Sequence, residues 1–278
     1  MGLPLPAALA PGLSDHLCHV YDGVSELSEH AVAYLVDGIA VGQRAVVIAP
    51  ARDLGLAREI ADAAVLDSAG GRVDVIELGR IAGGGDLDVR VTLRSLDAAL
   101  ASALEQGCTG LRVVTMLTQP ATEPFLRQAL GAWEHAVGEW QSLRPVAWAC
   151  CFDRSVLGDK AAQEFACLHP RVVTTGPSAP FRLYFRAGQL VLDGEVDSFS
   201  APLLAQALTH VRVAPGERLL IDARGLTFIN HRGLAALVDG LARRCGGVTL
   251  LGAPALVTRL RPNLGVGDDV LDVLPCPW

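Results

Sequence analysis

The sequence predicts an α/β protein with an N-terminal three-layer region on a mostly parallel sheet and a smaller C-terminal α/β region. Short segments that are apolar on both faces, as buried parallel strands are, alternate with segments of helical periodicity. A stretch of linker composition at residues 174–180 separates two such series. A length of 278 residues leaves room for two modest domains, although one larger domain also fits.

The N-terminal elements follow from apolar periodicity and from the residues that start and stop helices. Asp22 and Asp53 are expected to cap helices, and Gly42 and Pro50 to end a helix and a strand. The expected strands cover residues 16–21, 44–49, 73–78, 111–117 and 146–152, and the helices after them end near residues 42, 68, 106, 142 and 168.

The C-terminal elements include a hairpin and a strand–loop–helix unit. Strands at 181–186 and 189–193 are joined by Ala187 and Gly188, and a helix from Ser198 or Ser200 reaches His210. Strands at 219–222 and 226–229 then precede Asn230, which is of the type that caps a helix. A strand at 248–251, a short helix at 254–260 and a strand near 270–274 complete the expected order.

The unit that contains Asp222, Leu226, Phe228 and the loop Asn230-His231-Arg232-Gly233 resembles the STAS domain of anti-sigma-factor antagonists, over essentially the whole of residues 181–274. In that family an Asp-Ser-Ser/Thr-Gly loop opens the helix, and a partner kinase phosphorylates the second hydroxyl residue. The resemblance implies a partner-binding tip formed by Thr227, Asn230, His231, Arg232 and Gly233. The partner would be an anti-sigma factor or a related serine kinase.

Arg232 stands where the family has its phosphoacceptor, so the usual phosphorylation switch is expected to be lost here. A cation in the first turn of a helix is mildly unfavourable, by roughly 0.3–1 kcal/mol at an exposed site. Two interpretations are open: drift after the site lost its use, or contact between Arg232 and a carboxylate or phosphate of a partner.

The first region carries a second resemblance, to the MEDS sensory domain. Its motifs are 16–21 (His-Leu-Cys-His-Val-Tyr), 110–112 (Gly-Leu-Arg), 151–154 (Cys-Phe-Asp-Arg) and 169–170 (His-Pro), in family-like order. The resemblance implies a degenerate RecA-like core and sensing of small organic molecules. The family often has Gly-Glu-Met after the fourth strand, where this chain has Val-Thr-Met at 114–116, so that glutamate's role is not carried over. We therefore predict a MEDS-like domain at 14–175 and a STAS-like domain at 181–278.

A small organic ligand is expected at the carboxyl ends of the parallel strands. The predicted contacts are His16, Tyr21, Asp22, Arg112, Asp153 and Arg154. Taken singly, several of these residues also fit structural roles, such as caps, ion pairs and a core histidine. No metal site and no cofactor are predicted, because His16 and Cys18 share a strand face that His19 does not, and these three cannot converge.

Composition excludes several classes of function. A net charge of −7 without a basic cluster argues against nucleic-acid binding, and seven cysteines without a Cys-x-x-Cys pair argue against a disulfide framework or zinc site. Lys160 is the only lysine, and no Gly-x-x-x-x-Gly-Lys-Ser/Thr string occurs, which argues against ATP hydrolysis. The first eleven residues make a poor signal peptide and no segment could span a bilayer, so a cytoplasmic protein is expected.

The sequence thus favours a non-enzymatic signalling regulator. Two alternatives remain open: a nucleotide-binding or nucleotide-hydrolysing enzyme that uses the RecA-like region, and a scaffold or homo-oligomer within a larger signalling assembly. The run of three glycines at 83–85 matches no phosphate-binding spacing and is expected to be a flexible connection.

Overall fold

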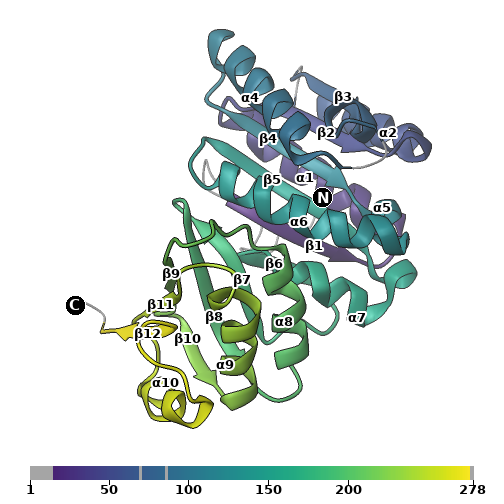
Figure 1. Ribbon diagram of the computed structural model, residues 1–278. Coiled ribbons are helices and arrows are strands. Elements are labelled where there is room, and N and C mark those ends of the chain that lie inside the picture. The colour runs from purple at the N-terminus through teal and green to yellow at the C-terminus, as the bar shows by residue number, and fades with distance from the viewer. Residues whose placement is uncertain (1–14, 69–70, 85–86, 276–278) are drawn as a thin grey trace.

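The computed structural model describes residues 15–68, 71–84 and 87–275, which form two β-sheets flanked by helices (Figure 1). One sheet lies in the N-terminal part and one in the C-terminal part, so the fold class is α/β, as the sequence predicts. The leader used in the signal-peptide argument, Gly85 and the last three residues of the expected STAS-like domain lie outside the described residues.

All six strands of the N-terminal sheet, sheet A, run parallel in the order β3-β2-β4-β5-β1-β6. They are β1 (Asp15–Tyr21), β2 (Arg44–Ala49), β3 (Val73–Glu77), β4 (Leu111–Met116), β5 (Val146–Asp153) and β6 (Arg171–Thr174). Every residue of β4 and β5 is buried. This explains why their sequences are mostly apolar, with Arg112 and Thr115 as the polar residues within β4, since parallel sheets are usually covered by helices on both faces.

Helices cover the two faces of sheet A in separate layers. Helices α1 (Val24–Ala40) and α2 (Leu54–Asp67) pack on one face. Helices α4 (Val89–Glu105), α6 (Pro124–Gln141) and α7 (Arg154–Ala166) pack on the other. The shorter elements are a 3₁₀ turn (Ala51–Asp53), α3 (Leu78–Ile81) and α5 (Thr118–Thr122). The expected three-layer arrangement is therefore present.

Three details of the N-terminal prediction were wrong. Asp53 directly precedes α2, but its side chain accepts no capping hydrogen bond. Asp22 does not cap α1: the residue before the helix is Gly23, with a positive φ of 87°, and the Asp22 carboxylate pairs with Arg154 instead. Strand β6 was not expected, because its sequence is short and merges with the linker-like stretch that begins at Thr174. It adds to the sheet beside β1.

The second sheet, sheet B, is mixed. Its path is β10-β8-β9-β11-β12 in parallel, and β7 pairs antiparallel with β8. The strands are β7 (Phe181–Arg186), β8 (Gln189–Val196), β9 (Leu219–Asp222), β10 (Leu226–Ile229), β11 (Val248–Leu251) and β12 (Leu271–Leu274). The hairpin at Ala187 and Gly188 is confirmed, and both residues have positive φ (50° and 76°), as a tight hairpin turn requires.

The helices of the C-terminal part begin close to the predicted residues. They are α8 (Ala201–His210), α9 (His231–Leu237), which continues into a π-helical turn (Val238–Ala242), α10 (Ala255–Leu260) and a final 3₁₀ turn (Arg261–Leu264). Ser200 precedes α8 and Asn230 precedes α9. Both strand–helix units of this part therefore lie where the sequence puts them.

The two parts of the chain contact each other through α6. The ring of His135 packs edge-on against Phe185 of β7, with centroids 5.8 Å apart. On the same helix, Gly131 lies against the ring of His210 at the end of α8. The core of the C-terminal part also includes Cys167 and Leu168 from the end of α7. Whether residues 14–175 and 181–278 are separate folding domains stays a prediction.

Among residues 15–68, 71–84 and 87–275, none of the helices combines the length and the apolar character needed to cross a bilayer.

Candidate functional site

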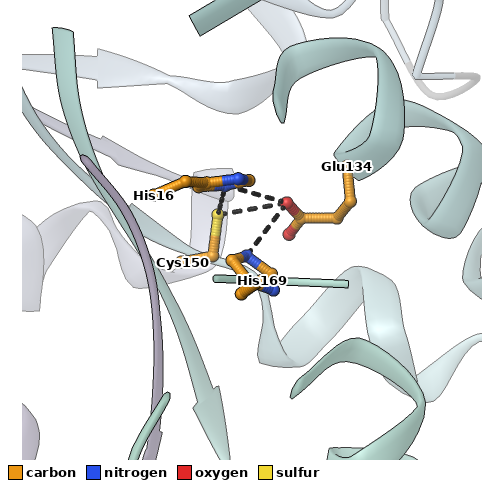
Figure 2. A group of neighbouring side chains, drawn as sticks. All are labelled: His16, Glu134, Cys150 and His169. Atoms are coloured by element: carbon orange, nitrogen blue, oxygen red, sulfur yellow. Dashed lines mark hydrogen bonds and ion pairs between the residues drawn. The ribbon is translucent and has the colours of Figure 1, made fainter. Parts of the chain in front are cut away.

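Four buried polar side chains meet between sheet A and α6, and we call them the buried cluster (Figure 2). His16 comes from β1, Cys150 from β5, Glu134 from the middle of α6, and His169 from the turn between α7 and β6. None of the four is more than 3% exposed. Polar and ionisable groups buried this deeply are unusual and point to a specific role.

Strand alternation and helix position bring these side chains together. β1 and β5 are parallel neighbours, with His16 opposite Trp148 and Cys18 opposite Cys150. His16 and Cys150 therefore point to the α6 side of the sheet. Helix α6 lies between sheet A and the C-terminal part, which covers its outer side with β7 and α8. A charged residue in the middle of α6, Glu134, is buried for that reason.

The donor atoms of the buried cluster surround one carboxylate oxygen. Glu134 Oε2 lies 3.2 Å from Cys150 Sγ, 3.4 Å from His169 Nε2 and 3.5 Å from His16 Nε2, and the last nitrogen is 3.4 Å from Cys150 Sγ. His169 Nδ1 lies 2.9 Å from the carbonyl oxygen of Phe165. Glu134 Oε1 and His169 Nε2 have no hydrogen-bond partner.

The surroundings shift the ionisation of these groups in opposite directions. Burial opposes ionisation of Glu134, but the adjacent His169 and His16 outweigh it and hold the pKa of this carboxyl at about 2. Burial, and then the charge of Glu134, raise the pKa of the Cys150 thiol well above its usual range. Burial, and then His169, lower the pKa of His16. The cluster thus presents a carboxylate beside a thiol and imidazoles.

A second group of ionisable side chains lies on the opposite face of sheet A, under α1. His19 Nε2 is 2.8 Å from His30 Nδ1, and 3.8 Å from a carboxylate oxygen of Glu26. His16 and His19 therefore take part in different clusters on different faces, as strand alternation predicts. The His19–His30 contact already gives each of the two facing nitrogens a partner.

Four of the predicted ligand contacts meet at the carboxyl edge of sheet A. The hydroxyl of Thr118 lies 3.3 Å from that of Tyr21 and accepts the backbone N–H of Asp153 at 2.8 Å. The carboxylate of Asp22 pairs with Arg154, whose hydrogen bond lowers the pKa of Asp22. These groups are satisfied by one another, and their contact with a ligand stays a prediction.

The structure does not bring the other two predicted contacts, His16 and Arg112, to that edge. Arg112 is 1% exposed, its guanidinium lies 4.6 Å from the centre of the Tyr34 ring, and its Nε donates to Gln43 Oε1 at 2.8 Å. Arg112 is the second residue of β4 and lies at the opposite end of that strand from the carboxyl edge. The predicted strands at 16–21 and 111–117 already begin at or next to His16 and Arg112, so placing these two residues at the carboxyl edge was wrong.

A pocket of about 530 Å³ opens at the carboxyl ends of β2, β3 and β4, and we call it the switch-point pocket. The chain leaves β2 through α2 on one face of the sheet and leaves β4 through α6 on the other, which makes this a topological switch point. Ligands of open parallel sheets bind at such points. The pocket is lined by Pro50, Ala51, Glu77, Leu78, Gly79, Arg80, Gly84, Leu87, Gln119, Pro120 and Leu126.

The predicted partner-binding residues lie together at the start of α9, which we call the docking tip. Asn230 caps the helix by accepting the N–H of Gly233 at 3.0 Å, and its amide donates to Ser198 at 2.8 Å. His231 and Arg232 are exposed, whereas Gly233 is buried against Ile229 and Val196. Thr227 is exposed and its hydroxyl donates to Gly194 O. The solvent-facing helix start required by the sequence argument is thus present.

A groove of about 500 Å³ lies between α7 and the start of α8, next to the docking tip. Lys160 and Gln163 of α7 form one side, and Phe199 and the first turns of α8 form the other. Phe199 is 93% exposed and directly follows Ser198, the partner of Asn230. The loop that contains Ser198 and Phe199 therefore connects the groove to the docking tip.

The sequence analysis missed the buried cluster and the switch-point pocket. Glu134 was detectable, because a glutamate within the apolar face of the helix at 124–142, next to Trp133 and Val137, has no reason to be there unless it has a buried partner. Cys150 was considered only as one of seven cysteines without a Cys-x-x-Cys pair. The glycine run expected to be a flexible connection gave a second signal, since Gly84 lines the switch-point pocket.

Comparison with models of known protein families gives a match to the N-terminal part. The family model described as MEDS, the MEthanogen/methylotroph, DcmR Sensory domain, matches residues 15–170, which is more than half of the chain. No curated protein matches.

Proposed function

Because this chain belongs to the MEDS family, we propose that it is a non-enzymatic signalling regulator whose C-terminal part binds an anti-sigma factor or a related serine kinase. In this proposal the N-terminal part senses a small organic ligand, and the docking tip contacts the partner. The sensory family supports the regulatory role. The partner and the STAS-like character of residues 181–278 rest on the sequence resemblance and on the exposed docking tip.

The chemistry of the docking surface favours an acidic partner. His231 and Arg232 are exposed at the start of α9, and the nearly fully exposed Phe199 directly follows Ser198, the hydrogen-bond partner of Asn230. Arginine and aromatic side chains are the residues that most often dominate binding energy at protein interfaces. The exposed Phe199 is therefore the observation that best supports a docking role for this surface.

Ligand sensing is assigned to the switch-point pocket. Its volume of about 530 Å³ lies in the range of small-molecule sites, and its walls combine apolar residues with Arg80, Glu77 and Gln119. A ligand there would contact the loops that follow β2, β3 and β4. The predicted contacts at Tyr21, Asp22, Asp153 and Arg154 lie at the same edge of sheet A.

Helix α7 offers a route between sensing and docking. It begins at Arg154, which is paired with Asp22 at the carboxyl edge, and it forms one wall of the groove beside the docking tip. Gly158, with a φ of 77°, kinks α7 between these two points. A ligand that repositions the first turn of α7 would therefore alter the groove that the partner contacts.

Calorimetric titration of the full chain with anti-sigma factors of the serine kinase class tests the docking assignment. We expect the substitution Arg232→Glu to weaken binding by about tenfold or more, since a charge reversal opposite an acidic surface costs at least ~1.4 kcal/mol. The matched control is Arg212→Glu, an exposed arginine beyond the opposite end of α8, which should leave the affinity unchanged.

Equal affinities for the two variants would contradict the docking assignment. Incubation with the same kinase and ATP provides an independent check. Stoichiometric phosphate on Thr227 or Ser198 would overturn the proposed loss of the phosphorylation switch. Turnover of ATP or GTP by the purified chain would favour the enzyme alternative, and a large assembly in light scattering would favour the scaffold.

A further inference from the structure

We propose that the buried cluster binds one Zn²⁺ ion through His16 Nε2, Glu134 Oε2, Cys150 Sγ and His169 Nε2. The four atoms all lie within 4.8 Å of one another. They come from four separate elements of the N-terminal part (Figure 2). The site is independent of the docking tip and of the switch-point pocket, so it does not rest on the proposed function.

Four of the six separations within the cluster are close to the edge length of a tetrahedron around zinc. Bonds of about 2.0–2.3 Å from Zn²⁺ to N, O and S place ligand atoms roughly 3.3–3.7 Å apart. These four separations are 3.2, 3.4, 3.4 and 3.5 Å, and they join Glu134 Oε2 to the other three atoms and His16 to Cys150. The two separations from His169 to His16 and to Cys150 are no longer than 4.8 Å. An ion at the common centre would therefore need only small side-chain shifts.

Hydrogen bonding alone explains the same arrangement poorly. Charge-assisted bonds between an imidazolium and a carboxylate are about 2.7–2.9 Å long, which is shorter than either histidine–Glu134 distance here. His169 Nε2 and Glu134 Oε1, both fully buried, lack hydrogen-bond partners. Polar atoms in such surroundings are costly unless something else satisfies them.

The contact between His169 and Phe165 orients His169 as a ligand. Donation from Nδ1–H to the carbonyl oxygen at 2.9 Å leaves Nε2 as the ring nitrogen that faces Glu134. A metal ion beside these two groups would take that nitrogen and the carboxylate oxygen, 3.4 Å apart, as neighbouring ligands. Histidine ligands of metals are typically held through their second nitrogen in this way.

The donor set selects the metal. Two imidazole nitrogens, one thiolate and one carboxylate in tetrahedral arrangement are typical of zinc, whereas magnesium and calcium prefer oxygen ligands alone. Four protein ligands leave no open position, which is typical of structural rather than catalytic sites. On binding, the Cys150 thiol releases its proton to solvent and the thiolate takes its place at the metal.

The fold provides a route to the site. His16 also lines a cavity of about 160 Å³ between the start of β1, the end of α6 and the β7–β8 hairpin. This cavity lies between the two parts of the chain, so an ion can reach the ligands from the cleft that they share. Bound zinc would then hold β1, β5, α6 and the end of α7 together beside the interface with the C-terminal part.

Metal analysis of the full-length protein tests the proposal. The chain is stripped with a chelator, titrated with Zn²⁺ against a chromophoric competitor, and separately loaded with Co²⁺. We expect one Zn²⁺ per chain, and Co²⁺ should give intense tetrahedral d–d bands together with a thiolate-to-metal charge-transfer band. Cys150→Ser and Glu134→Gln should weaken zinc binding by at least about 100-fold.

The matched control is Cys151→Ser. Cys151 is adjacent and equally buried, but it belongs to the core on the α1 face of the sheet. This variant should retain both the stoichiometry and the charge-transfer band. Co²⁺ loading of the unmodified chain does not depend on how the variants fold. The absence of a thiolate band in that spectrum, or equal zinc loss in the two cysteine variants, would overturn the proposal.

Discussion

At the scale of single residues, the burial of His19 makes the folding stability of the protein sensitive to acid. Its side chain is 2% exposed and shares a hydrogen bond with His30. Burial, and then the neighbouring His30, lower the pKa of His19 to about 3. In the unfolded chain the pKa returns to about 6.5. Below that pH the unfolded state therefore binds a proton that the folded state does not, and stability falls.

We predict that the substitution His19→Gln flattens the loss of stability on acidification. At pH 5 the wild-type His19 costs about 2 kcal/mol relative to pH 7, from the difference between the two pKa values. Glutamine has no such protonation and can still donate to His30. Urea denaturation at pH 7, 6 and 5 measures the effect. The control is His231→Gln, since His231 is exposed.

The slope of stability against pH should be unchanged in the His231 variant and reduced in the His19 variant. Parallel slopes for wild type and His19→Gln would contradict the assignment of a neutral, buried His19. The buried His210, whose pKa is also lowered by burial, contributes its own loss of stability at low pH in every variant. The comparison therefore uses differences between variants and not absolute values.

Single residues also show which site features are visible in a sequence. Strand alternation correctly separated His16 from His19, because the period of two is fixed by backbone geometry. Asp22 was wrongly assigned as a cap. Its carboxylate pairs instead with Arg154, which is close in space but 132 residues later in the sequence. The partners of His16 were not predictable from local spacing, since Glu134 and His169 come from distant segments. Local periodicity shows which face of an element a side chain lies on, but not which distant side chain it contacts.

At the scale of elements, α9 depends on its cap. Asn230 accepts the N–H of Gly233 and bridges to Ser198 in the loop before α8. The helix itself has seven residues before its π-helical turn, so only a few backbone hydrogen bonds stabilise it. Most of its stability comes from tertiary packing of Leu234 and Leu237.

We predict that Asn230→Ala destabilises the protein by about 1 kcal/mol, because the Gly233 N–H loses its acceptor. Asn230→Asp retains a capping oxygen and adds a favourable negative charge at the helix start, so it should cost less. Thermal and urea unfolding of the two variants provide the measurement. Equal stability of Asn230→Ala and wild type would show that solvent replaces the cap.

Elements were predicted well where the sequence signal is local and strong. The strands of sheet A that are buried on both faces, such as β4 and β5, have mostly apolar sequences and lie within a residue or two of the prediction. β6 was not predicted, because its four half-buried residues give too weak an apolar pattern next to a linker-like stretch. The strand order, in which β1 lies between β5 and β6, is decided by packing of distant segments.

At the scale of the whole molecule, close contact between α6 and α8 joins the two parts. A Cβ atom on Gly131 would lie 2.4 Å from His210 Nε2, and the His210 ring is largely buried. Glycine at this position therefore sets how closely the two helices approach. No positive φ is involved, so the requirement is one of space.

We predict that Gly131→Ala destabilises the protein by about 1–3 kcal/mol through overpacking of this contact. Adding His210→Ala should restore part of the loss, because the ring that clashes is removed. The matched control is Gly55→Ala in the first turn of α2, where nothing lies within 4 Å. That substitution should stabilise by up to about 1 kcal/mol, since alanine favours helix. The urea midpoints of the wild type, Gly131→Ala, the double variant and Gly55→Ala measure these changes in stability. Equal changes in stability for Gly131→Ala and Gly55→Ala would contradict the close contact between Gly131 and His210.

The groove beside the docking tip has one further chemical property. Lys160, on its α7 wall, is the only lysine of the sequence and is exposed. An amine-selective acylating reagent therefore meets a single side chain at this location, apart from the chain's own α-amino group. A fluorophore attached there would report on movements of α7 without any engineered residue.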